Sequence, residues 1–462
     1  MAAIDVVIMA AGKGTRMKSR LPKVLHRLAG RALLRHVVDT ATALAARSVI
    51  VVTGNGAEQV EAAVASWQGA TVRFVRQEPQ LGTGHAMQQA APVLPDDGIA
   101  LVLYGDVPLI APATLKALVD ASAGQQLALL TIDMADPTGY GRIVREGGRV
   151  KAIVEHKDAS AEQRAIGEVF TGFMAIPNRR LKGWLARLKN DNAQNEYYLT
   201  DIVGFAVADG EAVATVKAPE QAQVDGVNSP LQLAALERAY QLRRARELME
   251  SGVRIADPAR FDVRGSLVCG QDVEIDVNCV FDGSVLLGEG VTIGPNCFIR
   301  NATIAAGARI HAFTHIDGEN GAVTIGEGAL VGPFARLRPG ADLGPEVHIG
   351  NFVEVKNSKM GRGSKANHLA YLGDSTVGER VNYGAGSITA NYDGASKHRT
   401  VIEDDVHIGS NCVLVAPVTI GHGGTVGGGS TITKDTAPDT LSVGRGKQVS
   451  ISGWQRPTKP AK

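Results

Sequence analysis

Apolar side chains recur at every sixth position in three long stretches of this chain, residues 269–299, 325–355 and 402–432. An α-helix repeats every 3.6 residues and a half-buried strand every two residues, so neither element explains this spacing. A coil of three short parallel strands does explain it, because each side of the triangle points one apolar side chain inward. The period therefore predicts a parallel β-helix, from near Arg264 to near Val443, over about half of the chain.

Interruptions of the period are the places where chemistry is expected, because residues outside the repeat are not required by the core. Glycine often follows an inward residue, as at Gly326, Gly350 and Gly409, and we expect these glycines at the corners. The longest interruption covers residues 359–400, and a shorter one covers residues 318–322.

The first half of the chain has a different pattern, in which apolar runs at residues 6–10, 49–53 and 100–104 alternate with alanine-rich helical segments. This alternation predicts a Rossmann-like α/β domain with a mostly parallel sheet, which binds ligands at the carboxyl ends of its strands. A long helix should follow, with Ser229 as its N-cap, Pro230 in its first turn and Gly252 after its end. We therefore expect a nucleotide domain (1–227), a helical linker (228–252) and a β-helix with a basic tail (253–462).

Composition excludes several functional classes. A formal net charge of +1 argues against a nucleic-acid-binding or polybasic membrane protein. The first apolar segment is interrupted by Asp5 and lacks a basic flank, so it resembles a buried strand more than a signal peptide. The cysteines Cys269, Cys279, Cys297 and Cys412 form no CxxC pair, which predicts free thiols in a reducing cytoplasm and no zinc site.

Residues 10–23 form a glycine-containing loop directly after the first strand. Gly12 and Gly14 allow the backbone to approach a phosphate, and Arg16 and Lys23 can neutralise a triphosphate. A tight turn with solvated charges is the alternative. Asp106 ends another apolar strand, where a metal-binding carboxylate is expected, although a simple Gly-Asp turn would have the same sequence.

Two cations of the solenoid, Arg338 and Lys356, are eighteen residues apart, which is one full coil. They should stack about 4.8 Å apart and repel each other unless an anion lies between them, so they predict a phosphate site. Two independently solvated cations are the alternative. His368 lies in the longest interruption with Glu354 nearby, and its ordinary titration range suits a general base. A purely structural histidine is the competing interpretation.

The segments MAAGKGTRMKSRLPK (9–23), QEPQLGTGHA (77–86) and YGDVP (104–108) resemble the signature of sugar-phosphate nucleotidyltransferases. Joined to a hexapeptide solenoid, the whole chain resembles the family of bacterial bifunctional N-acetylglucosamine-1-phosphate uridyltransferases and glucosamine-1-phosphate acetyltransferases. The resemblance implies acetyl transfer from acetyl-CoA to glucosamine 1-phosphate, then uridylyl transfer from UTP to N-acetylglucosamine 1-phosphate with release of pyrophosphate. It also implies Mg²⁺, a left-handed β-helix, a homotrimer in the cytoplasm, and a product used for peptidoglycan and lipopolysaccharide.

For uridylyl transfer, the resemblance implies that Arg16 and Lys23 act in catalysis and that Asp106 and Asn228 bind Mg²⁺. The residues implied to bind the nucleotide or its sugar are Met9, Ala10, Ala11, Gly12, Lys23, Gln77, Gly82, Thr83, Tyr104, Gly105, Asp106, Gly141, Glu155 and Asn228. The chain departs from the family at Phe170, where a sugar-binding Asn is usual, so that contact is not carried over.

For acetyl transfer, the resemblance implies His368 as the general base, while Glu354 receives only an orienting or electrostatic role. The residues implied to bind glucosamine phosphate are Arg338, Lys356, Tyr371 and Asn382. Those implied to bind acetyl-CoA are Ala385, Asn391, Tyr392, Ser410, Gly428 and Arg445, with the Ala385 amide as an oxyanion donor. Gly428 stands where relatives often have Ala. Trimeric closure would combine residues of different chains in one site.

Two alternatives to this function remain open from the sequence. One is a monofunctional sugar-1-phosphate nucleotidyltransferase with a regulatory or trimerising β-helix. His368, the stacked cations Arg338 and Lys356, and the Asn391-Tyr392 pair argue against it. The other is a non-catalytic scaffold, in which changing His368 would alter no activity.

Overall fold

The computed structural model describes residues 2–67, 69 and 71–457, and it divides the chain into two compact units, Met1–Tyr240 and Gln241–Lys462. Helix α8 (Pro230–Glu250) begins in the first unit and ends in the second. Each unit is described by itself below.

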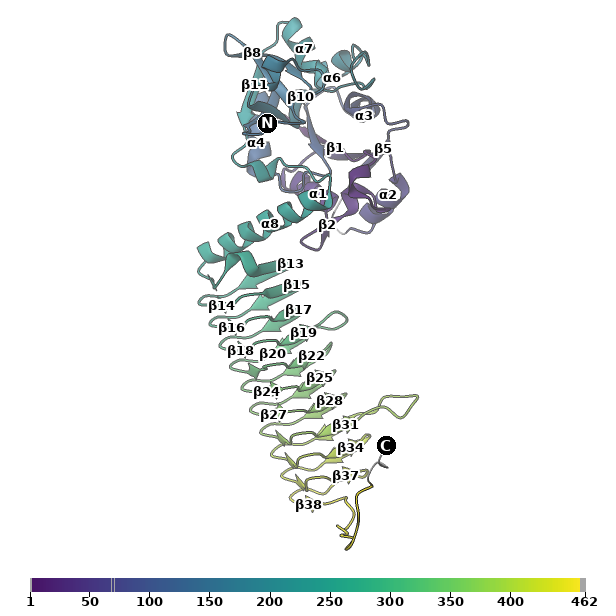
Figure 1. Ribbon diagram of the computed structural model, residues 1–462, viewed down its shortest axis with the longest axis vertical. Coiled ribbons are helices and arrows are strands. Elements are labelled where there is room, and N and C mark those ends of the chain that lie inside the picture. Colours follow the sequence, from purple (N-terminus) through teal and green to yellow (C-terminus); the bar gives the residue numbers. More distant parts are fainter. Residues whose placement is uncertain (1, 68, 70, 458–462) are drawn as a thin grey trace, which may run out of the picture. The chain divides into compact units, whose positions relative to one another are not determined.

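The first unit contains a nine-stranded mixed sheet in the order β11-β7-β10-β6-β1-β4-β5, with a β8-β9 hairpin beside β10 (Figure 1). The pairs β1–β4, β1–β6, β4–β5 and β11–β7 are parallel, and β10 is antiparallel to its neighbours. The strands are β1 (Ile4–Met9), β4 (Ser48–Thr53), β5 (Arg73–Arg76), β6 (Ile99–Tyr104), β7 (Leu127–Asp133), β8 (Gly141–Glu146), β9 (Arg149–Val154), β10 (Glu168–Pro177) and β11 (Val213–Lys217). The α/β class expected from the sequence is confirmed.

Helices pack on both faces of this sheet, because alternate side chains of its central strands point to opposite sides. In β1, Val6 and Ile8 belong to one buried cluster, and Val7 and Met9 belong to another. The helices are α1 (Leu33–Ala43), α2 (Ala57–Ala65), α3 (Thr83–Ala90), α4 (Pro112–Ser122), α5 (Ala161–Arg164), α6 (Asn178–Leu185) and α7 (Asp201–Ala208).

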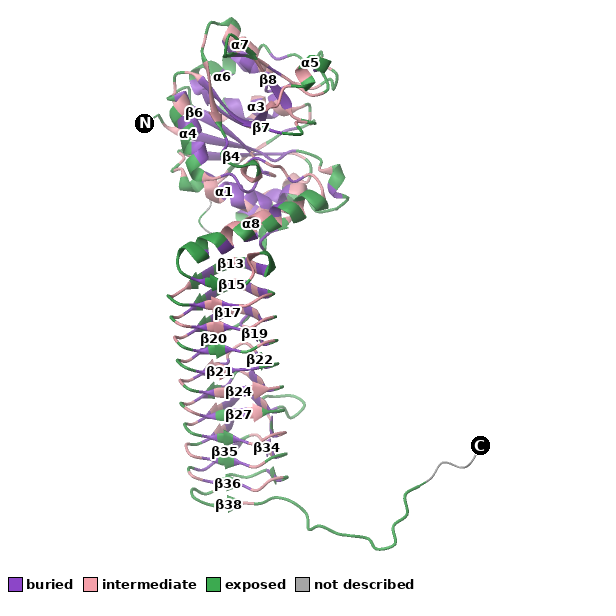
Figure 2. Cartoon of the chain, turned by 60° about the vertical axis from the view of Figure 1, so that its left-hand side comes forward, coloured by how far each residue is buried: buried purple, intermediate pink, exposed green. Residues whose placement is uncertain are grey.

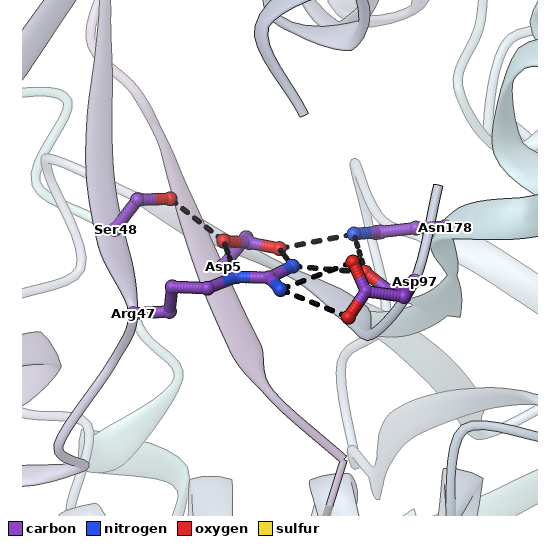
Figure 3. A network of polar contacts seen from close by, with 5 residues as sticks. All are labelled: Asp5, Arg47, Ser48, Asp97 and Asn178. Carbon is purple, nitrogen blue, oxygen red and sulfur yellow. Dashed lines mark hydrogen bonds and ion pairs between the residues drawn. The ribbon is translucent and has the colours of Figure 1, made fainter. Parts of the chain in front are cut away.

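Asp5, which interrupts the first apolar segment, is fully buried in a network of polar contacts (Figure 3). Its carboxylate accepts hydrogen bonds from Arg47 Nη2 at 2.6 Å, Ser48 Oγ at 2.8 Å and Asn178 Nδ2 at 3.0 Å. A buried charge is tolerated only when it is paired in this way. The hydrogen bond that Arg47 donates to Asp5 raises the pKa of Arg47, and the network joins β1 to the starts of β4 and α6.

The second unit is a stack of coils whose strands repeat along three faces (Figure 1). Face 1 includes β24 (His348–Asn351), β27 (Lys365–His368), β30 (Asn382–Tyr383), β33 (His407–Ile408) and β36 (Thr425–Val426). Face 2 includes β22 (Arg336–Leu337), β25 (Glu354–Lys356), β28 (Tyr371–Gly373), β31 (Ile388–Ala390) and β34 (Val413–Val415). Face 3 includes β20 (Val323–Ile325), β23 (Asp342–Leu343), β26 (Lys359–Met360), β29 (Ser375–Val377), β32 (Thr400–Ile402) and β35 (Val418–Ile420). Strands within each face pair in parallel, which confirms the parallel β-helix.

Two edges of this coil matter for function. Edge A is the corner where the chain passes from face 1 to face 2, and edge B is the corner from face 2 to face 3. The two long interruptions of the period, between β19 (His315–Asp317) and β20 and between β31 and β32, both lie at edge B.

The period-six residues line the interior, where purple marks buried positions along the coils (Figure 2). The buried positions of the three stretches are Ile275, Phe281, Leu287, Ile293, Ile299, Ile325, Val331, Leu337, Leu343, Ile349, Val355, Ile402, Ile408, Leu414, Ile420, Val426 and Ile432. Cys269, the first of these positions, is only partly buried, so it is not as fully enclosed as the sequence predicted. All four cysteines are free thiols, and the other three are buried.

Glycine follows many inward residues because the next coil leaves no room for a side chain. A Cβ on Gly326 or Gly350 would overlap the backbone of Gly344 or Asn367 in the neighbouring coil. A Cβ on Gly421 would lie 2.7 Å from Pro438 N. These glycines are therefore required because adjacent coils lie too close for a Cβ atom. This constraint is stricter than the need for a flexible backbone at a corner.

Candidate functional site

The first unit contains a cavity of about 500 Å³ at the carboxyl ends of β1 and β6. Its walls come from the glycine loop, from the segment around the start of α3 and from the end of β6. The expected nucleotide residues that line it are Met9, Ala10, Ala11, Gly12, Lys23, Gln77, Gly82, Thr83, Tyr104 and Asp106. Lys13, Gln80 and Glu196 also line it, and the sequence analysis had not selected them.

A second cavity of about 360 Å³ shares Thr83, Tyr104 and Asp106 with the first. It contains the residues expected at the sugar end, together with Arg16 and Phe170. The expected members are Arg16, Gly141, Glu155 and Asn228. The structure thus brings the three motif segments, together with Gly141, Glu155 and Asn228, to two adjoining cavities. Gly105 lies between two lining residues, and its N–H donates to the Met9 carbonyl at 3.0 Å.

Asp106 and Asn228 present oxygen atoms to one cation in the structure, the ammonium group of Lys23. Lys23 Nζ lies 2.5 Å from Asp106 Oδ2 and 3.1 Å from Asn228 Oδ1. The ammonium occupies a position where a carboxylate and an amide oxygen converge, and such oxygens are ligands that Mg²⁺ accepts together with phosphate oxygens and water. The donor set therefore fits Mg²⁺, with Lys23 standing in for a cation.

Glu155 is a partly desolvated carboxylate in the wall of the second cavity. Burial raises its pKa, while the Thr200 hydroxyl donates to Glu155 Oε1 at 3.0 Å and opposes this shift. Thr200 therefore fixes the orientation of this carboxylate in the cavity wall. Burial also raises the pKa of Tyr140 in the same wall to about 12, which keeps its hydroxyl protonated at neutral pH.

Gln77 and Phe170 occupy defined positions in these walls. Gln77 is buried, and its Nε2 donates to the Gly82 carbonyl at 2.8 Å, so its own carbonyl oxygen is left to accept from a ligand. Phe170 is 6 % exposed and presents an aromatic surface where the family pattern has an amide.

Edge A of the second unit carries His368 and a column of residues from the following coils. Asn351 and His368 are directly paired across β24 and β27, and His368 Nδ1 lies 2.9 Å from Asn351 Oδ1. An amide oxygen can only accept, so Nδ1 carries the proton and Nε2 is the free basic nitrogen. The orienting partner of His368 is therefore Asn351. The sequence analysis missed it, although its spacing from His368 is one coil.

In the coils that follow His368 along edge A lie residues expected to bind acetyl-CoA. Gly386 N–H donates to the His368 carbonyl, Asn411 N–H to the Ala385 carbonyl and Gly429 N–H to the Ser410 carbonyl. Arg445 Nη1 donates to the Gly428 carbonyl at 2.6 Å. These contacts place Ala385, Ser410, Gly428 and Arg445 in one column. The Ala385 N–H has no acceptor among the described residues, as an oxyanion donor requires.

Edge B carries the expected cations. Arg338 and Lys356 lie in adjacent coils, with Arg338 N–H donating to the Val355 carbonyl at 2.9 Å. The nearby Lys397 ammonium, and then burial, lower the pKa of Lys356. Lys397 belongs to the excursion after β31, and no period in the sequence indicated that it would lie beside Lys356.

Glu354 contacts two arginine side chains of the same chain. Its carboxylate accepts from Arg338 Nη1 at 2.7 Å and from Arg336 Nη1 at 3.3 Å. Its parallel partner in the next coil is Tyr371, on face 2. Within the chain, the partners of the Glu354 carboxylate are therefore the guanidinium groups of Arg336 and Arg338.

The excursion between β31 and β32 contains Asn391 and Tyr392. Asn391 is buried at edge B, whereas the Tyr392 ring is exposed and its hydroxyl donates to the Gly394 carbonyl at 2.6 Å. Asp393 accepts from the backbone N–H groups of Ala395 and Ser396, which closes the excursion as a tight turn.

One chain does not gather all of the expected acetyl-transfer residues in one place. His368, Ala385, Ser410, Gly428 and Arg445 belong to edge A, and Asn382 lies on face 1. The cations and Asn391 belong to edge B. The strands of face 2 separate the two edges, so a single prism presents two half-sites.

Two classes of feature are absent from the described residues. Within residues 2–67, 69 and 71–457, no cluster of three or more His, Cys, Asp or Glu side chains could hold a metal ion. Every helix in that part of the chain is too short or too polar to cross a bilayer.

Comparison with known proteins gives a result for each half and for the whole chain. Residues 6–191 match the model of the MobA-like NTP transferase domain, and residues 322–357 and 399–434 match the bacterial transferase hexapeptide model. The bifunctional protein GlmU of Albidiferax ferrireducens is 71 % identical over 99 % of this chain and 100 % of its own length. The GlmU proteins of Polaromonas naphthalenivorans and Azoarcus sp. are 72 % and 57 % identical, each over 99 % of this chain, and over 98 % and 100 % of their own lengths.

These matches extend over both units, and the two transferase domains occur in the order that the sequence motifs indicated. The chain therefore belongs to the family of bifunctional GlmU proteins, which confirms the family expected from its sequence.

Proposed function

We propose that the two units perform consecutive reactions that produce UDP-N-acetylglucosamine. The β-helix transfers the acetyl group of acetyl-CoA to glucosamine 1-phosphate, and the α/β unit then joins the product to the uridylyl group of UTP. The observation that carries this proposal is that the same solenoid has an oriented base, His368, and a group of three cations, Arg338, Lys356 and Lys397. A scaffold or a purely regulatory β-helix needs neither feature.

In uridylyl transfer, a phosphate oxygen of N-acetylglucosamine 1-phosphate attacks the α-phosphorus of UTP, and the bond to the β-phosphate breaks. Arg16 and Lys23 neutralise the charge that moves onto the leaving pyrophosphate. The buried Gln77 amide and the backbone of residues 9–12 hold the nucleotide in the first cavity. Glu155, oriented by Thr200, accepts a hydrogen bond from the sugar in the second cavity.

Mg²⁺ suits this site through Asp106 and Asn228, whose oxygens both contact the Lys23 ammonium. When bound, the ion supplies positive charge to the phosphate oxygens. With the ion held by Asp106 and Asn228, the Lys23 ammonium would contact the phosphates. This arrangement explains why a lysine that is expected to bind triphosphate also lies against the proposed metal ligands.

In acetyl transfer, the amino nitrogen of glucosamine 1-phosphate attacks the thioester carbonyl of acetyl-CoA. His368 Nε2 takes the proton from this nitrogen, and the Ala385 N–H stabilises the oxyanion. The carbon–sulfur bond then breaks, the amide forms, and the coenzyme leaves as a thiol after His368 returns the proton. Arg338, Lys356 and Lys397 hold the phosphate group of the sugar.

We further propose a homotrimer in which edge A of one chain faces edge B of its neighbour. The proposal is supported by the separation of the two half-sites on one prism, because a closed ring of three prisms brings complementary edges together. The substrates UTP and acetyl-CoA and the four free thiols favour a cytoplasmic location.

The experiment compares Asp106→Ala and His368→Ala in the full chain, with pyrophosphate release and coenzyme A thiol release measured on the same preparations. We expect Asp106→Ala to lose uridylyl transfer by at least roughly a hundredfold and to retain acetyl transfer. His368→Ala should lose acetyl transfer by about a hundredfold or more and retain uridylyl transfer.

Absence of thiol release from the unaltered protein would favour the monofunctional nucleotidyltransferase instead. Loss of both reactions in either folded variant would contradict separate sites.

A further inference from the structure

Three polar side chains form a column along edge B beside the cation group. Asn357, Asp374 and Asn391 follow one another at intervals of seventeen residues, so each occupies the same place in successive coils. The pairing of Lys356 with Gly373 and of Tyr371 with Ile388 sets this register. The column therefore joins the coil that carries Lys356 to the start of the excursion.

Asp374 is the middle member and the one charged member of the column. It is 7 % exposed, its Oδ1 accepts from Asn357 Nδ2 at 2.6 Å, and its Oδ2 accepts from Asn391 Nδ2. A carboxylate has no N–H to give, so both amides must turn their NH₂ groups toward it. The orientation of each amide is thus fixed by chemistry and not by packing alone.

The consequence is clearest at Asn391, where the column ends. With Nδ2 held by Asp374, the amide oxygen Oδ1 must point away from the column, and it accepts no hydrogen bond from the described residues. The next coil has Ala416 at this place, whose side chain has no donor. Asn391 therefore presents a free acceptor at edge B.

Asp374 also joins the backbones that frame the half-site. Its N–H donates to the Lys356 carbonyl at 3.0 Å, and its carbonyl accepts from the Thr400 N–H at 3.2 Å. Thr400 is the first residue after the excursion. The same residue thus holds the phosphate-binding coil, the end of the excursion and the amide of Asn391 in one arrangement.

We propose that Asp374 is a positioning residue for acetyl transfer, which holds the Asn391 oxygen as an acceptor for an N–H group of the bound substrates. This inference rests on the proposed acetyl-transfer site. The two substrates offer suitable donors, the sugar amine and the amides of the coenzyme arm. Because the acceptor is already held in place, less conformational entropy is lost when the substrate binds.

The test uses Asp374→Asn in the full chain, because Asn has almost the same shape and also tolerates the left-handed backbone at this position, where φ is 50°. The amide introduced by this substitution can donate to Asn391 and so allow the Asn391 amide to turn. We expect kcat/KM for acetyl transfer to fall roughly tenfold, as for one lost hydrogen bond, while uridylyl transfer is unchanged.

The decisive variant is the double change Asp374→Asn with Asn391→Asp. The exchanged pair keeps one N–H···O bond and again leaves an oxygen pointing outward, so kcat/KM should recover at least about threefold over Asp374→Asn. The control is Asn357→Gly, which removes the other amide at a residue with φ of 44° and leaves Asn391 held. It should change kcat/KM by less than about threefold.

Full activity of Asp374→Asn would overturn the proposal. A double variant whose kcat/KM is no higher than that of Asp374→Asn would also overturn it. So would a loss of kcat/KM in Asn357→Gly as large as that in Asp374→Asn. Both results are expected if the column has only a structural role. If Asp374→Asn fails to fold, as judged by a lost β-sheet signal in circular dichroism, the double variant measured against Asn391→Ala still decides. Equal activity of these two would reject a positioned acceptor.

Discussion

Individual residues of the β-helix act through partners one coil away. Asn351 defines the tautomer of His368, and Asp374 defines the orientation of the Asn391 amide. Arg338 lies one coil before Lys356 on the same edge. In each pair the spacing is seventeen or eighteen residues. A functional residue in a solenoid is therefore best understood together with the residues at the same place in the coils before and after it.

Lys397 should be a third phosphate ligand, and Lys397→Met tests it at the residue scale. The variant should raise the KM for glucosamine 1-phosphate about tenfold and leave the KM for UTP unchanged, because one charge-assisted hydrogen bond is lost. Lys359→Met, an exposed lysine on face 3, is the matched control.

The same variant has a defined pH effect. Lys397 lowers the pKa of Lys356, so its removal raises that pKa, and Lys356 keeps its charge to higher pH. The alkaline limb of kcat/KM for glucosamine 1-phosphate should therefore move to higher pH. An unmoved limb, or a lower one, would show that the two lysines are not electrostatically coupled in solution.

At the scale of elements, strand spacing decides which residues are allowed. The period of six predicted the interior of the β-helix, because burial depends only on which side of the coil a residue occupies. The sequence could not predict the glycine constraint in full, since it arises from backbone atoms of the next coil, such as those of Gly344 opposite Gly326.

Gly326→Ala should destabilise the β-helix, because its Cβ would overlap the Gly344 backbone. We expect a loss of about 1–3 kcal/mol, measured as a lower midpoint of unfolding followed through acetyl transfer. Gly321→Ala is the control, since its Cβ would have its nearest neighbour at 3.5 Å. Equal midpoints for the two variants would show that the coils move apart without cost.

Much of the candidate site followed from sequence motifs, and the exceptions have physical reasons. The motifs around Gly12, Gln77 and Asp106 each end a strand of one sheet, so their meeting in two cavities was predictable. Thr200 was not predictable because it reaches Glu155 from a separate segment. The contact between Glu354 and Arg338 was not predictable from nearness in sequence, because it joins two adjacent coils.

For the whole molecule, the division into two units separates the two reactions, while the proposed trimer combines the two edges of the β-helix. The α/β unit contains both cavities of uridylyl transfer within one chain. The β-helix unit has the residues proposed for acetyl transfer on edges A and B, so its activity should depend on assembly.

Mixing His368→Ala chains with Lys356→Ala chains tests this dependence. If each site combines edge A of one chain with edge B of its neighbour, random trimers from equal amounts should recover roughly a quarter of the normal acetyl transfer. The chains must be unfolded and refolded together, with separately refolded chains as the control. No recovery in mixed trimers, confirmed by mass, would indicate that each chain builds its own site.

Edge B is also the place where the chain gains length without disturbing its neighbours. Both excursions, between β19 and β20 and between β31 and β32, leave at this corner and return to an unbroken ladder on face 3. New segments inserted here can differ freely in length and composition, whereas a single insertion within a face would shift every inward side chain of that coil. The corner is therefore a position at which inserted segments of different length are accommodated without changing the buried interior of the β-helix.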